Sequence, residues 1–92
     1  MDVYDRAIEH YGREKQCMMT AEECAELIQA LSKALRYDGE SFIRQVAEEV
    51  ADVEIMLEQV KRMFGLSPYT VDEYKNIKLA RLEWYIKQDK GA

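Results

Sequence analysis

The chain has 92 residues, of which 48% are hydrophobic and 34% are charged, and its formal net charge is −5. A chain of this length forms one small domain, so we expect a single domain over residues 1–92. The hydrophobic share excludes an intrinsically disordered chain. The negative charge argues against a dedicated nucleic-acid-binding protein, which normally has a basic face. One proline, four glycines and few β-branched residues favour an all-α fold.

The sequence shows no targeting segment. Its N-terminal residues lack the charged and apolar regions of a signal peptide, and no apolar run approaches the ~20 residues that span a bilayer. Cys17 and Cys24 would lie ~10 Å apart on a straight helix, too far for a disulfide. We therefore expect a cytoplasmic protein with no membrane contact and two reduced cysteines.

Apolar spacing and turn residues predict four helices. Their expected ranges are 2–11, 14–37, 41–64 and 70 to about 87, with Ser41 and Thr70 as N-caps and Gly12, Gly39 and Gly65 after the C-termini. The loop between the second and third helices is short, so these two helices should be antiparallel neighbours. We predict an all-α, four-helix, antiparallel bundle-like protomer.

The third helix carries the clearest apolar row, with spacings of three and four throughout. Its members are Ile43, Val46, Val50, Val53, Leu57, Val60 and Phe64. At ~1.5 Å per residue this helix is about 36 Å long, which exceeds the core of a small domain. We expect the row to be buried across a subunit boundary, in a homodimer or a homotetramer.

Two acidic turns match each other position by position. They are Glu22-Glu23-Cys24-Ala25-Glu26-Leu27 and Glu48-Glu49-Val50-Ala51-Asp52-Val53. Residues three apart share a helix face, so Glu23 pairs with Glu26, and Glu49 pairs with Asp52. If the two helices pack side by side, four carboxylates converge. Such a cluster is costly at the edge of a core unless a cation lies among the carboxylates.

Carboxylate oxygens select hard cations, Mg²⁺ or Mn²⁺, over zinc, which prefers cysteine and histidine. With His10 as the only histidine, a ferritin-type di-iron site is nearly excluded. Mg²⁺ held by carboxylates usually serves a phosphate-bearing substrate. Lys78 and Arg81, one helical turn apart, are candidates to neutralise the phosphates.

Two alternatives stay open at the level of the residues. Thr20 and Glu23 fit a capping box, which would use Glu23 on a backbone N–H, unless the second helix begins earlier. The acids also fit a solvated surface, in which case the chain is a non-catalytic helical oligomerisation module. A separate possibility is a module that binds nucleotides without turnover and signals through a partner.

The acidic motifs resemble those of the MazG-like all-α nucleotide pyrophosphohydrolases. The similarity lies in Glu22-Glu23-x-x-Glu26, twenty-two intervening residues, and Glu49-x-x-Asp52. The segments 48–57 and 78–83 resemble the second motif and the basic segment of that family. The resemblance covers roughly residues 14–87, and this chain looks like a compact member with a single repeat.

The resemblance implies a dimerising helical protomer with Mg²⁺ held by four acids, Glu23, Glu26, Glu49 and Asp52. It implies hydrolysis of a nucleoside or deoxynucleoside triphosphate by attack of water on the α-phosphorus, which yields the monophosphate and pyrophosphate. Such an activity would serve house-cleaning of the nucleotide pool.

By the same resemblance, Glu22 or Glu48 would orient ligands or the water, and Lys78 and Arg81 would face the phosphates. The phosphoribosyl-ATP and dUTP branches share the metal motif, so the substrate stays open. The candidate side chains for stacking on a base are Tyr11, Tyr37, Trp84 and Tyr85.

Overall fold

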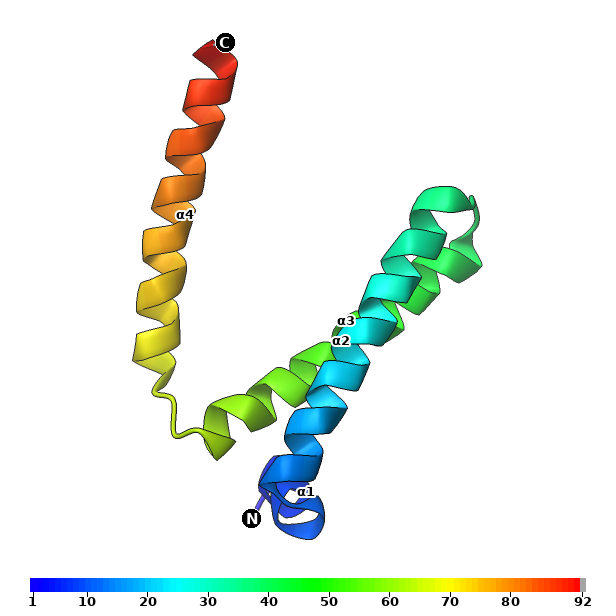
Figure 1. The fold of residues 1–92 in the computed structure, drawn as a ribbon, viewed down its shortest axis with the longest axis vertical. Helices are drawn as coiled ribbons and strands as arrows, with labels where there is room; N and C mark the ends of the chain where they lie inside the picture. Colours follow the sequence, from blue (N-terminus) through cyan, green and yellow to red (C-terminus); the bar gives the residue numbers. More distant parts are fainter. Residues whose placement is uncertain (92) are drawn as a thin grey trace.

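The computed structural model describes the backbone of residues 1–91 and the side chains of residues 1–89. The helices are α1 (Val3–Tyr11), α2 (Arg13–Arg36), α3 (Glu40–Met63) and α4 (Pro68–Gly91) (Figure 1). This part of the chain contains no strand. The predicted all-α class with four helices is therefore confirmed. None of the described helices combines the length and the apolar character that crossing a membrane requires.

Helices α2 and α3 form a hairpin, run side by side in opposite directions, and are joined by residues 37–39. Helix α1 crosses the end of the hairpin where α2 begins and α3 ends, whereas α4 stands apart (Figure 1). The Cα radius of gyration is 16.9 Å, against about 12 Å for a compact chain of this length. Closure of a bundle by a second subunit stays a prediction.

The start of α2 decides how Glu23 is used. Because α2 already begins at Arg13, Thr20 lies inside the helix, and its Oγ1 donates a hydrogen bond of 2.8 Å to the backbone oxygen of Gln16. The capping-box interpretation is therefore wrong. The carboxylate of Glu23 is not used as a helix cap.

Two other predicted caps are also wrong. Helix α3 begins at Glu40 directly after Gly39, whose φ of +136° favours glycine, so Ser41 is already helical. Helix α4 begins at Pro68, because Ser67 Oγ accepts the Tyr69 N–H at 3.2 Å and proline suits a first helical position. In both cases the helix begins before the residue that was expected to cap it.

Gly65 ends α3 as predicted. Its φ is +62°, and its N–H donates to the Arg62 oxygen at 3.2 Å while the Leu66 N–H donates to the Lys61 oxygen at 2.8 Å. This pair of bonds is a Schellman motif, which satisfies the last carbonyls of a helix. The motif turns the chain away from the hairpin before α4 begins.

An ionic network fixes α1 to α3. Arg62 Nη1 lies 2.7 Å from both carboxylate oxygens of Asp2 and 3.3 Å from Asp5, and Nη2 lies 3.2 Å from Glu58. The guanidinium also lies 4.8 Å from the ring centroid of Tyr4. The hydrogen bonds from Arg62 hold the pKa of Asp2 below its usual value. Helix α1 is thereby fixed over one end of the hairpin.

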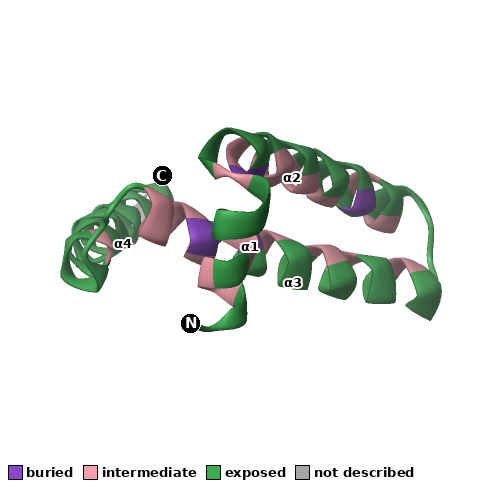
Figure 2. Ribbon diagram, turned by 90° about the horizontal axis from the view of Figure 1, so that it is seen from below, coloured by how far each residue is buried: buried purple, intermediate pink, exposed green. Residues whose placement is uncertain are grey.

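Very little apolar surface is buried within one chain. Few places on the ribbon are buried (Figure 2), and among the described residues only Ala30 and Met56 are buried apolar residues. Each of the two lines a cavity together with residues of the other helix of the hairpin. The apolar row of α3, which is predicted to be buried across a subunit boundary, is largely exposed in the single chain, with Ile43 at 66% and Leu57 at 44%. Cys17 and Cys24 are unpaired, as expected, and half-buried. A single chain therefore leaves its main apolar row uncovered.

Candidate metal centre

The contact between α2 and α3 is lined by polar side chains as well as by apolar ones. One row on each helix, with spacings of three and four, faces the other helix. The rows are Gln16, Met19, Glu23, Glu26 and Ala30 on α2, and Gln45, Glu49, Asp52, Met56 and Gln59 on α3. The hairpin therefore places two acids of each helix at the middle of its own interface.

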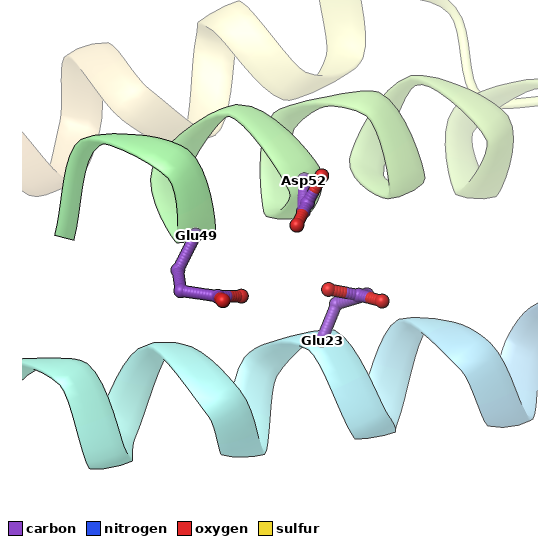
Figure 3. Close-up of side chains that lie close together, drawn as sticks. All are labelled: Glu23, Glu49 and Asp52. Atoms are coloured by element: carbon purple, nitrogen blue, oxygen red, sulfur yellow. The ribbon is translucent and has the colours of Figure 1, made fainter. Parts of the chain in front are cut away.

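Glu23, Glu49 and Asp52 converge between the two helices. One carboxylate oxygen from each lies within 4.8 Å of the others. Glu23 points up from α2, and Glu49 and Asp52 point toward it from α3 (Figure 3). Glu23 and Glu49 are half-buried and Asp52 is exposed. Three of the four predicted metal ligands therefore come together.

Glu26, the fourth predicted ligand, is not one of the three converging acids, but its charge acts on two of them. Burial raises the pKa of Glu23, and repulsion from Glu26, Asp52 and Glu49 raises it further. Burial also raises the pKa of Glu49, followed by repulsion from Glu26 and then Asp52. Within the described residues, no lysine or arginine forms an ion pair with any of these four acids.

Two oxygens of this cluster are buried without a partner. Oε2 of Glu23 and Oε2 of Glu49 are inaccessible to solvent and accept no hydrogen bond in the part of the chain that the structure describes. A buried carboxylate oxygen without a partner is costly, and most buried polar atoms are satisfied. A divalent cation with oxygen ligands would satisfy both. The donor set, which consists of carboxylates alone, fits Mg²⁺ or Mn²⁺.

The other predicted site residues lie outside this cluster. Glu22 and Glu48 are exposed beside it, each next to a converging glutamate. Lys78 and Arg81 are exposed on α4, which does not pack along the hairpin. The chain by itself does not bring these two cations to the acids. The roles of all four residues stay predictions.

Two cavities lie along the contact between α2 and α3, one on each side of the acids. The two cavities and the acids between them are called the groove below. The first, about 340 Å³, is lined by Tyr11, Lys15, Gln16, Met19 and Met56. The second, about 190 Å³, is lined by Glu26, Gln29, Ala30, Lys33, Gln45 and Glu49. The first cavity is mainly apolar with one amide and one cation, Lys15, and the second is mainly polar with one cation, Lys33. The two ends of the groove therefore differ in apolar character, whereas each has a lysine.

The sequence analysis missed Gln16 and Gln59. Both are buried, and Gln16 Nε2 donates a hydrogen bond of 2.8 Å to Gln59 Oε1 between the helices. Gln16 lies seven residues before Glu23, and Gln59 lies seven after Asp52. Extending each acidic row by two helical turns would have found them, because a spacing of seven keeps a residue on the same face.

Comparison with known proteins identified no relative of this chain. No protein-family model, no curated protein and no solved structure matches this chain. The membership in the MazG-like family therefore stays a prediction that rests on the acidic motifs. The functional proposal is therefore based on the residues and the geometry of the groove.

Proposed function

We propose that this protein is a Mg²⁺-dependent nucleotide pyrophosphohydrolase of the MazG-like type. It cleaves a nucleoside or deoxynucleoside triphosphate to the monophosphate and pyrophosphate, as a homo-oligomer. The observation that carries the proposal is the pair of buried, unpartnered oxygens on Glu23 and Glu49 within a cluster of acids. Magnesium in phosphate chemistry is usually bound by one or two carboxylates together with the substrate phosphates, and this cluster offers carboxylates for such binding.

Four residues would hold the metal, namely Glu23, Glu26, Glu49 and Asp52. When bound, Mg²⁺ would lower the pKa of water and offset the charge of the phosphates during an in-line displacement. Mn²⁺ would substitute, because it accepts the same oxygen ligands. Glu22 and Glu48, next to the ligands, are the candidates to orient the attacking water or the ligand side chains.

The two cavities support a nucleotide as the substrate. The first cavity offers an aromatic ring, two methionines and the Gln16 amide, a combination suited to a planar base with hydrogen-bonding edges. Met19 and Met56 each lie one helical turn from an acid, about 6 Å along the axis. Lys33 lines the second cavity beside Glu26 and Glu49. A nucleotide with its base in the first cavity would have its phosphates near the acids, with one lysine in each cavity, Lys15 and Lys33.

A homo-oligomer would remove the exposed apolar surface of the chain. The accessible surface is 7501 Å², whereas a compact monomer of this mass exposes about 5,500 Å². The excess of roughly 2,000 Å² per chain lies in the range of permanent subunit interfaces. The unpaired Cys17 and Cys24 agree with a reducing compartment such as the cytoplasm.

The test is release of pyrophosphate from a panel of nucleoside and deoxynucleoside triphosphates with MgCl₂. We expect turnover that stops with excess EDTA and returns with Mg²⁺ or Mn²⁺. Isothermal titration with Mg²⁺ alone should give saturable binding that Glu49→Gln abolishes. Weak, non-saturable heat together with no turnover would favour a non-catalytic oligomerisation module. Nucleotide binding without turnover would favour a binding module.

A further inference from the structure

Helix α4 projects from the hairpin without packing along another helix of the chain, and it is called the arm below. It has 24 residues, as many as α2 and as many as α3, so it is long enough to span the whole hairpin. Every described side chain along it is exposed except that of Val71, which is half-buried (Figure 2). Isolated helices of this kind are marginal in water, and most helices are stabilised by packing. Helix α4 therefore needs a surface that its own chain does not supply.

The side chains of α4 are sorted by charge around its axis. At about 100° per residue, its apolar side chains fill an arc of about 220° that runs from Trp84 through Tyr74 to Leu79. Three basic residues, Lys75, Lys78 and Arg81, lie inside this arc. Three acids, Asp72, Glu73 and Glu83, lie on the other side of the helix together with Lys87, whereas Asp89 lies inside the arc near its C-terminal end. The face that needs covering is therefore both apolar and basic.

The hairpin offers a matching surface. Helix α2 also has an apolar row, made by Cys24, Ile28, Leu31 and Leu35. The apolar rows of α2 and α3 are offset from the acids in the same rotational sense, and the two helices are antiparallel, so both rows lie on one side of the hairpin. The side chains exposed there include Ile28 at 67%, Leu31 at 46% and Val50 at 39%. The acids lie between these two rows. This surface is apolar with a negative centre, the complement of α4.

We propose that α4 of one copy packs on the α2–α3 hairpin of a second copy and brings Lys78 and Arg81 to that copy's acids. The inference rests on the proposed function and assigns the phosphate-binding cations of each site to the other subunit. The exchange is reciprocal about a two-fold axis, so a dimer contains two shared sites. A lone chain is then incomplete, since its described acids have no cationic partner.

The first test mixes two inactive variants, Glu49→Gln and the double variant Lys78→Ala/Arg81→Ala, and allows subunits to exchange. In a mixed dimer with shared sites, one site receives intact acids from one chain and intact cations from the other. Random pairing then restores about a quarter of the wild-type turnover. If the cations acted within their own chain, no site would be intact and the mixture would stay inactive, which would overturn the proposal.

The second test does not need turnover. Leu82 is replaced by a photoreactive benzoylphenylalanine. Unlabelled and ¹⁵N-labelled full-length chains are then mixed, irradiated and digested. We expect cross-linked peptide pairs that join position 82 of one isotope to residues 13–63 of the other. Pairs exclusively of a single isotope, with no mixed pairs, would show α4 folded on its own hairpin, and pairs confined to two copies of α4 would show contact between arms. Either result would overturn the arm exchange.

The two tests distinguish a failure of the proposed enzyme function from a failure of the arm exchange. A wild-type protein without turnover that still gives mixed-isotope cross-links keeps the arm exchange and refutes the pyrophosphohydrolase. Turnover with cross-links exclusively of a single isotope keeps the enzyme and refutes the exchange. As a control for the position of the probe, the same photoreactive residue in place of Glu83, on the other side of α4, should cross-link to the hairpin at least about tenfold less.

Discussion

The inner and outer faces of the α2–α3 hairpin reverse the usual arrangement of a small protein. Between the helices lie Gln16, Glu23, Glu49 and Gln59, all buried or half-buried, beside only two buried apolar side chains. On the outside lie the apolar rows, with Leu35 exposed at 90%. Soluble monomers normally bury such rows and leave the acids in water.

This difference indicates what each face is for. Buried acids without a cation and exposed apolar rows without a cover both raise the free energy of the folded chain. A ligand in the groove would relieve the first cost, and a second subunit would relieve the second. The inner face therefore fits binding and the outer face fits assembly. A change on the inner face should therefore abolish binding and leave assembly intact, whereas a change on the outer face separates the subunits that share the sites.

The largest effect is expected for Glu49→Gln on the inner face. Removing this charge weakens the metal site, and a bound metal supplies several kcal/mol of transition-state stabilisation, so turnover should fall by at least about 10³-fold. The measurement is the initial rate of pyrophosphate release at saturating MgCl₂. Circular dichroism and light scattering should be unchanged, because the outer face is intact.

The matched control is Glu54→Gln on the same helix, an exposed acid outside the cluster. Its rate should stay within about twofold of the wild type, since surface substitutions have small effects. Equal rates for both variants would show that the inner acids are merely a polar surface.

The next effect is expected for Val50→Asp on the outer face. A charge placed in an apolar subunit contact is costly to desolvate, so the dissociation constant of the oligomer should rise at least about 100-fold. Light scattering at micromolar concentration should change from an oligomer to a monomer. Ala51→Asp adds the same charge outside the apolar row and should leave the mass unchanged. A Val50→Asp protein with the wild-type mass would refute the assembly role of this face.

The sequence was sufficient for the four helices and for the convergence of acids between α2 and α3, but not for what covers the apolar row of α3. Both rows on α3 repeat at spacings of three and four, so helical periodicity alone cannot say which row meets α2. The matching acidic turns indicated the row with Glu49, and α3 does turn the row with Glu49 and Met56 toward α2. The row with Val50 finds no cover within one chain, and helical periodicity does not identify a partner outside it.

Gln16→Leu tests whether the first cavity binds the base of the nucleotide. The change keeps the side-chain size but removes the amide next to Met19 and Met56, and one lost hydrogen bond is worth about 1 kcal/mol. It also takes the donor from Gln59 Oε1, so the variant should lose stability, and the kinetics are measured well below its Tm. We expect the KM for the nucleotide to rise roughly fivefold with kcat within about twofold. Gln29→Leu, on the exposed flank of α2 at the other end of the groove, should affect KM less. A fall in kcat alone would assign Gln16 to the reaction instead of the base.

The smallest expected effect is the pH dependence of stability without metal. The pKa values of Glu23 and Glu49 are raised in the folded chain, chiefly by burial, above the usual value of 4.5. Between that value and the raised values, the folded chain binds more protons than the unfolded chain does. Stability therefore falls as the pH rises through this window, and the full penalty persists above it.

Thermal unfolding in EDTA, at one protein concentration, should give a Tm that decreases by a few degrees from pH 5 to pH 8. Mg²⁺ should raise the Tm most at the upper end of this range, because protons compete with the metal at the lower end. Glu23→Gln should flatten the decrease in EDTA and reduce the response to Mg²⁺, whereas Glu54→Gln should change neither. A Tm that rises with pH in EDTA would mean that the inner acids are stabilised in their charged form without any cation, and the groove would then have no need of a metal.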